Sequence, residues 1–149
     1  MKAPFLIGRL IFGGFFIYNG INHLKNRKQL SQYVAGKKVP KPELAVSATG
    51  VMLIAGGTSI VLGVQPKIGA VAILAFLLGV SPTMHDFWKA EDPNQRMADM
   101  TNFAKNMALA GAALALMGLE EPWPASIPAA QPTKLKRLKR LTRRACWAA

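Results

Sequence analysis

Four apolar stretches, each about as long as a bilayer-crossing helix, occupy most of the first 119 residues of the chain. They cover roughly residues 4–24, 44–64, 68–84 and 103–119, and the second and third contain no charged residue. A helix that crosses the hydrocarbon core of a membrane needs about 20 predominantly apolar residues, within a usual range of about 17 to 25. The sequence therefore predicts a protein that is embedded in a membrane.

A soluble helical bundle is the alternative fold. The helices of such a bundle carry polar residues along their outer faces, whereas residues 45–62 are apolar or small on every side. The hydrophobic fraction of the whole chain, 51%, also exceeds what a small soluble domain usually needs. We therefore predict the all-α class and, within it, an integral membrane four-helix bundle.

The domain organisation follows from these stretches. We expect one domain over residues 1–121, followed over residues 122–149 by a linker rich in proline and alanine and a basic, disordered tail. The fourth helix should begin before its apolar stretch, because Asp92 followed by Pro93 is typical of a helix start. The predicted helices are residues 4–24, 44–64, 68–84 and 93–119.

The connections between the predicted helices differ in length. Residues 26–41 form a lysine-rich connection that we expect to lie at the membrane surface. Residues 65–67 are the whole link between the second and third helices, so these two helices must be antiparallel neighbours. On the fourth helix small residues recur at steps of three and four, a pattern that allows close packing against another helix. They are Ala108, Gly111, Ala115 and Gly118.

The net charge of +12 comes mainly from two segments, residues 25–41 and 134–144. Both segments follow predicted membrane helices, and each basic residue near an anionic membrane surface contributes about 1 kcal/mol of attraction. Membrane lipids, with anionic headgroups at the basic tail, are therefore the expected partners, and we expect no nucleic acid partner. The alternative is that the tail is a solvated segment that sets only the topology.

Four crossings place both termini on the same side of the membrane. The basic residues divide evenly between the two sides, so the positive-inside rule does not decide the orientation by itself. The charge density of the tail favours cytoplasmic N- and C-termini. We expect a multi-pass protein of the cytoplasmic (inner) membrane.

Polar residues cluster at one depth of the predicted bundle. The end of the first helix, the start of the second, the end of the third and the start of the fourth share one side, and most polar residues within the helices fall there. Such residues are costly at membrane depth and usually face the bundle interior or a cavity. The candidate polar site, with one aromatic neighbour, consists of Asn19, Asn22, His23, Lys25, His85, Asp86, Trp88, Lys105 and Asn106. The alternative is that these residues cap helix ends and hydrogen-bond between helices.

Arg9 lies on the other side, roughly a turn and a half inside the first helix. Its side chain either extends along the helix so that the charge reaches the membrane surface, or makes a phosphate or lipid contact. The sequence leaves both interpretations open.

The residue set does not point to a resident cofactor. Cys146 is the only cysteine, so an internal disulfide, a CxxC redox pair and an iron–sulfur cluster are excluded. His23 and His85 lack a haem-attachment motif, and nothing requires them to converge with Asp86 on a metal ion, so no metal site is predicted. A quinone needs only a histidine or similar donor beside a carboxylate, with an apolar, aromatic wall that Trp88 could help to form.

Three segments occur in order along the chain. They are Arg9-Leu10-Ile11-Phe12 leading to Gly20-Ile21-Asn22-His23-Leu24-Lys25, then His85-Asp86-Phe87-Trp88, then Phe103-Ala104-Lys105-Asn106-Met107-Ala108-Leu109. With the predicted helices between them, they resemble the DoxX family of small four-helix bacterial membrane proteins over about residues 4–119. The basic tail adds nothing to this resemblance.

The resemblance implies quinone-linked redox work, because some DoxX relatives are subunits of membrane thiosulfate:quinone oxidoreductases and others are linked to oxidative-stress or sulfur-handling complexes. On this interpretation the chain is a subunit without an intrinsic cofactor that works with quinone and with a protein partner or a further copy of itself. The matching positions are Arg9, His23, Lys25, His85, Trp88, Lys105 and Asn106. The alternative is a non-catalytic membrane adaptor or a lipid- or partner-binding protein, so catalysis and substrate stay open.

Overall fold

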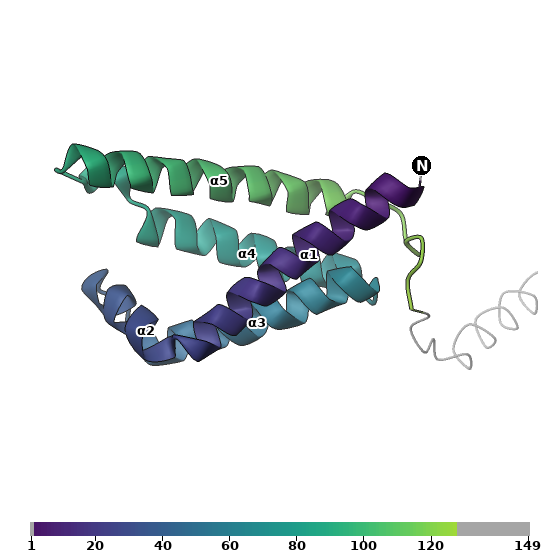
Figure 1. The fold of residues 1–149 in the computed structure, drawn as a ribbon, viewed down its shortest axis with the longest axis horizontal. Coiled ribbons are helices and arrows are strands. Elements are labelled where there is room, and N and C mark those ends of the chain that lie inside the picture. The colour runs from purple at the N-terminus through teal and green to yellow at the C-terminus, as the bar shows by residue number, and fades with distance from the viewer. Residues whose placement is uncertain (1, 128–149) are drawn as a thin grey trace, which may run out of the picture.

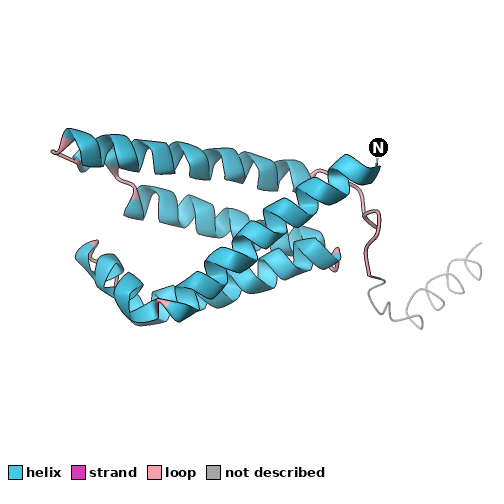
Figure 2. Ribbon diagram, in the orientation of Figure 1, coloured by secondary structure: helices cyan, strands magenta, loops and turns pink. Residues whose placement is uncertain are grey.

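The computed structural model describes residues 2–127, which form helices joined by short connections, with no strand among them (Figure 1, Figure 2). In chain order these elements are α1 (Lys2–Lys25), α2 (Arg27–Gly36), α3 (Pro42–Leu62), α4 (Pro66–Met84), the short 3-10 helix η1 (Phe87–Lys89) and α5 (Pro93–Met117). The four long helices lie within a few residues of the four predicted ones, so the all-α class is confirmed. The predicted basic tail and Cys146 lie outside the described residues.

Three helical segments are long and apolar enough to cross a membrane, namely Ala3–Lys25, Pro42–Leu62 and Pro66–Lys89. Large apolar side chains on their outer faces are exposed, among them Ile11 and Val51. A soluble monomer rarely leaves extended apolar surface in water, whereas the hydrocarbon of a bilayer accommodates it. The chain is therefore a multi-pass membrane protein.

Glycines set how closely these helices approach one another. A Cβ on Gly20 would lie 2.6 Å from the carbonyl oxygen of Gly50, so α1 and α3 pack backbone against backbone. On another face of α3, a Cβ on Gly69 of α4 would lie 2.6 Å from the carbonyl oxygen of Gly56. Small residues at such positions are what allow membrane helices to pack at short distance. Helix α3 thus lies between α1 and α4.

Helix α5 packs along α4 and returns the chain toward the N-terminal end of α1 (Figure 1). Its buried residues are Asp99, Asn106, Ala110 and Ala113. The predicted small-residue packing stripe is wrong, because Gly111 is exposed and a Cβ there would meet nothing within 4 Å. Asp99 of α5 pairs with His85, and Ala110, not Gly111, is on the buried side of the helix together with Asp99.

The composition of α5 does not place it among the segments apolar enough to cross a membrane. Its 25 residues span roughly 37 Å at a rise of about 1.5 Å per residue, which exceeds a hydrocarbon thickness of about 30 Å. The helix packs against α4, so neighbouring protein covers part of its surface. The architecture has four long helices, of which three qualify as crossings on their own composition.

Helix α2 lies within residues 26–41, the connection that was expected at the membrane surface and for which no helix was predicted. The segment carries a helix of 10 residues, and Lys38 and Lys41 reverse the chain after it with φ angles of 60° and 48°. Tertiary contacts stabilise this helix, because the hydroxyl of Tyr33 donates to the carbonyl oxygen of Met84 at 3.3 Å. A short helix with few apolar residues gives little periodic signal in the sequence.

The proline segment, residues 122–127, corrects the predicted start of the linker. Trp123 is 3% exposed and its ring lies 5.4 Å from that of Phe5. The guanidinium of Arg9 donates to the carbonyl oxygens of Pro124 at 3.0 Å and Ala125 at 3.1 Å. These contacts hold the described part of the predicted linker against the bundle, at the end where α1 begins (Figure 1).

Candidate functional site

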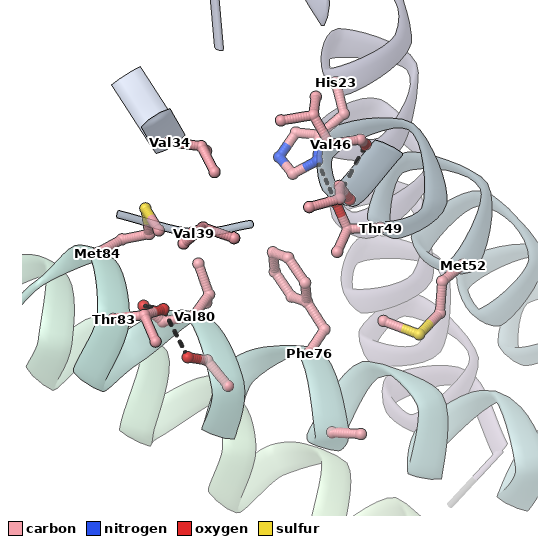
Figure 3. Close-up of a pocket in the computed structure, with 13 residues that line it drawn as sticks. His23, Val34, Val39, Val46, Thr49, Met52, Phe76, Val80, Thr83 and Met84 are labelled. Atoms are coloured by element: carbon pink, nitrogen blue, oxygen red, sulfur yellow. Dashed lines mark hydrogen bonds between the residues drawn. The ribbon is translucent and has the colours of Figure 1, made fainter. Parts of the chain in front are cut away.

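A cavity of about 340 Å³, here called the His23 cavity, lies among α1, α3 and α4 on the side where α2 packs (Figure 3). Its walls are mostly apolar, and no charged side chain lines it. His23 enters from α1, Thr49 from α3, Phe76 from α4 and Val34 from α2. Apolar walls with a few placed polar groups are typical of pockets for small organic ligands.

Thr49 fixes the His23 ring. The hydroxyl oxygen of Thr49 lies 2.8 Å from the carbonyl oxygen of Ala45 and 3.1 Å from that of Val46, so its hydrogen is donated within its own helix. The same oxygen lies 3.2 Å from Nδ1 of His23, and it accepts a hydrogen from that nitrogen as long as its own hydrogen is donated within the helix. With the bonds in this arrangement, a neutral His23 carries its hydrogen on Nδ1 and a lone pair on Nε2.

The His23 ring is turned into the cavity, toward Val34, Val39 and Phe76 (Figure 3). The ring of Phe76 meets it edge to face, with the ring centroids 5.9 Å apart. Thr83, the other polar residue near this wall, donates its hydroxyl hydrogen to the carbonyl oxygen of Gly79 at 2.7 Å. Nε2 of His23 is therefore the group best placed to exchange a hydrogen bond with a ligand.

A second group of side chains, here called the Asp86 cluster, lies where α2, the end of α4 and the start of α5 meet. Asp86 accepts from Lys37 and forms an ion pair with Lys89 at 3.4 Å. Beside it, Nδ1 of His85 lies 3.3 Å from Asp99, whose other carboxylate oxygen accepts from Gln95 at 2.9 Å. The members of the cluster are Lys37, His85, Asp86, Lys89, Gln95 and Asp99.

Two groups of this cluster that lie outside the membrane-spanning segments have altered acidity. The hydrogen bond to Asp86 is the main cause that raises the pKa of Lys37 above its ordinary value. The hydrogen bond from Gln95, followed by that from His85, lowers the pKa of Asp99 despite its burial. Both groups are therefore held in their charged forms at neutral pH.

The candidate residues predicted from the sequence do not form one site. His23 pairs with Thr49 in the cavity, whereas His85 pairs with Asp99 in the Asp86 cluster, so the two histidines belong to different groups of side chains. Met84 lies between them in the chain and forms part of the cavity wall. The side of the bundle on which the predicted polar residues gather thus contains two separate features, an apolar cavity and an ionic cluster.

The other candidate residues have local roles. Asn19 donates to the carbonyl oxygen of Phe15 at 2.7 Å. Asn22 accepts from Asn26 at 2.6 Å, and Lys105 donates to Asn102 at 2.9 Å. Each of these contacts joins residues three or four positions apart in the chain.

The three remaining candidates also lie away from the His23 cavity. Lys25 is exposed, and Asn106 is buried on the α4-facing side of α5. Trp88 is half exposed and packs edge to face on Phe87 and Phe103. None of the three lines the His23 cavity.

Several residues of the His23 cavity and the Asp86 cluster were not among the predicted site residues. Thr49 was visible as a polar residue on the same side as His23, but its hydrogen bond to His23 depends on how α1 and α3 pack. Phe76 and Val34 are apolar residues in apolar or weakly patterned segments, so no sequence signal separates them from ordinary packing residues. Asp99 lies seven residues before the buried Asn106, a spacing that places both on one helical face.

No group of three or more His, Cys, Asp or Glu side chains that could hold a metal ion occurs among residues 2–127. The carboxylates of the Asp86 cluster are instead in contact with Lys37, Lys89 and His85.

Comparison with known proteins identifies the family. The sequence model of the DoxX family matches residues 5–86, which is more than half of the chain. The chain belongs to the DoxX family. The matched range covers α1 to α4 and includes every residue that lines the His23 cavity, but it ends before Lys105 and Asn106. No curated protein and no solved structure matches the chain.

Proposed function

We propose that this DoxX-family membrane protein binds the ring of a quinone in the His23 cavity and serves as the quinone-binding subunit of a redox complex. The observation that carries the proposal is the combination of an apolar cavity with a histidine whose Nδ1 is held by Thr49. The family supplies the quinone hypothesis, and the cavity supplies a place for it.

The chemistry of a quinone fits this arrangement. A neutral His23 accepts a hydrogen bond through Nε2 from a hydroquinone hydroxyl, and a protonated His23 donates one to a quinone carbonyl oxygen. Reducing a quinone to a hydroquinone consumes two electrons and two protons. The electrons must come from a redox centre on a partner protein, because no resident cofactor is proposed for this chain.

The size of the cavity also favours a ring compound. Its volume of about 340 Å³ lies at the lower end of the range of about 300 to 1,000 Å³ for small-molecule pockets. A quinone ring with its substituents fits such a space, and its isoprenoid tail would extend into the bilayer. Phe76 provides an aromatic side chain against the ring-binding space.

The rival function is a non-catalytic adaptor that holds a lipid acyl chain in the same cavity. The absence of charge among the lining residues is compatible with an acyl chain. An acyl chain makes no directional hydrogen bond to Nε2, so replacement of His23 separates the two functions. A quinone ligand depends on the histidine, and an acyl chain does not.

The test is purification of the protein in native lipid particles, followed by extraction and identification of co-purified quinones. The wild-type protein should retain quinone above the level in the surrounding membrane lipid, and His23→Ala should lose it. Thr83→Ala is the matched control, because Thr83 lines the same cavity with its hydroxyl committed to its own helix. Equal quinone content in all three proteins and in bulk lipid would reject the proposal.

We further propose that the protein lies in the cytoplasmic membrane with both ends cytoplasmic and that its basic tail attracts anionic headgroups. The contact between Arg9 and Pro124 supports placement of the two ends on one side. A membrane-impermeant maleimide should then label Cys146 only after cells are opened. Labelling of the intact protein in closed cells would place the ends outside.

A further inference from the structure

Helix α2 separates two cavities of opposite character. Val34 lines the His23 cavity, whereas its neighbour Tyr33 lines a second cavity of about 330 Å³ beside the Asp86 cluster. The chain at the end of α4 lies between the same two cavities. Met84, the last residue of α4, lines the first cavity, and Asp86, two residues further on, lines the second. One layer of residues from α2 and α4 therefore separates the apolar cavity from a polar one.

Two contacts fasten α2 to the end of α4. The hydroxyl of Tyr33 donates to the carbonyl oxygen of Met84 at 3.3 Å, and the ammonium of Lys37 pairs with Asp86. Tyr33 lies near the end of α2 and Lys37 is the residue that caps it, so both contacts come from the C-terminal end of the helix. We call these two contacts the latch.

Apart from the latch, α2 packs against α3 but buries few of its own side chains. Ser31 is its only buried residue, and its N-cap residue Asn26 makes no side-chain capping bond. Lys38 and Lys41, in the turn that follows, have left-handed backbone conformations that a lysine rarely adopts. Segments with few buried apolar contacts open locally more easily than the core does.

We propose that α2 is a hinged cover on one side of the His23 cavity, held in place by the latch, and that its displacement admits water to His23. The second cavity carries the charged side chains of Lys37, Asp86, Lys89 and Asp99, so it is the aqueous side of this wall. The role of this cover rests on the proposed function, because a site that reduces a quinone needs a supply of protons. The existence of the cover does not depend on which ligand the cavity holds.

The test measures access to the cavity from water. In a Cys146→Ser background, Val46→Cys places one thiol on the cavity wall, where Val46 is 3% exposed. Its rate of modification by a small cationic thiol reagent is measured in lipid nanodiscs. Lys37→Ala or Asp86→Asn should raise this rate about fivefold, the change expected when a partly exposed ion pair is lost.

Three controls make the result specific. Glu43→Gln removes the exposed Arg27–Glu43 pair, at 3.9 Å, near the other end of α2 and should leave the rate unchanged. The exchanged pair Lys37→Asp with Asp86→Lys should restore the slow rate. A thiol placed by Leu53→Cys, at a position that is 0% exposed, should stay unreactive in every latch variant.

Two results would overturn the proposal. One is a modification rate at Val46→Cys that the latch variants leave unchanged. The other is a parallel rise at Leu53→Cys, which would mean that the whole bundle loosens. Because no quinone is present, either result is distinct from a failure of the proposed function, which the quinone content of the purified protein decides.

Discussion

Arg9 and Pro124 are 115 residues apart in the chain, and the guanidinium of one donates to the carbonyl oxygen of the other at 3.0 Å. Arg9 is 2% exposed, and its other terminal nitrogen donates to Ala125 at 3.1 Å. This contact ties the segment after α5 to the start of α1. It therefore closes the bundle at the end opposite the His23 cavity.

The first prediction concerns this closure. Arg9→Ala leaves the carbonyl oxygens of Pro124 and Ala125 without their donor, and loss of charged hydrogen bonds of this kind costs about 1.5 to 3 kcal/mol. The free energy of unfolding in detergent should fall by that amount. A protein of unchanged stability that binds anionic lipid more weakly would instead support the phosphate contact considered for Arg9.

Gly63 provides an independent variant at the same place. Its φ of 69° and a Cβ position only 1.9 Å from Oγ of Ser126 predict that Gly63→Ala also destabilises the closure. Gly14→Ala, where a Cβ meets nothing within 4 Å, is the control and should be nearly neutral.

The second prediction concerns acid stability. Because hydrogen bonds from Gln95 and then His85 lower the pKa of Asp99, the folded state binds a proton at Asp99 less readily than the unfolded chain does. The stabilisation from Asp99 is fully present at pH values above 3.8, the ordinary pKa of an aspartate. It is lost as the pH falls through the lower pKa that Asp99 has in the folded state.

The melting temperature of the detergent-solubilised protein should therefore decrease as the pH is lowered from about 4. Asp99→Asn should be less stable at neutral pH and should show a flatter dependence over that range. If the melting temperature of the wild-type protein changed with pH as little as that of Asp99→Asn, the proposed role of this carboxylate would be contradicted. Asp92→Asn serves as a control at an exposed carboxylate on the same helix start.

The third prediction concerns the tautomer of His23. Nitrogen-15 spectra should show a protonated Nδ1 and an unprotonated Nε2 in the neutral ring, and the His85→Gln variant leaves His23 as the one histidine of the sequence. Thr49→Val removes the acceptor and should produce a mixture of tautomers, whereas Thr49→Ser should keep the wild-type pattern. A spectrum unchanged by Thr49→Val would show that the threonine does not set the ring.

The sequence predicted the long helices well, because their signal is strong and local. Residues 44–64 have no charge, so their helix follows from the thickness of a bilayer alone. Proline at the start of α3, α4 and α5 marks helix boundaries that the structure reproduces. The DoxX resemblance rested on short segments, and the family match confirms it over residues 5–86.

The sequence could not predict contacts that depend on packing between distant segments. Helix α2 has one buried residue, and its position depends on Lys37 and Tyr33 meeting the end of α4. The division of His23 from His85 depends on the rotations of α1 and α5, which a shared membrane depth does not specify. Whether the candidate residues form a functional site stays a prediction.

Titration of the purified protein in nanodiscs with a short-tailed quinone, followed by quenching of tryptophan fluorescence or by calorimetry, tests the central claim most directly. The account predicts saturable binding that His23→Ala weakens about tenfold, the effect of losing one ligand hydrogen bond, while Thr83→Ala leaves the affinity within about twofold of wild type. Equal affinities of wild type and His23→Ala, or no saturable binding to wild type, would contradict it.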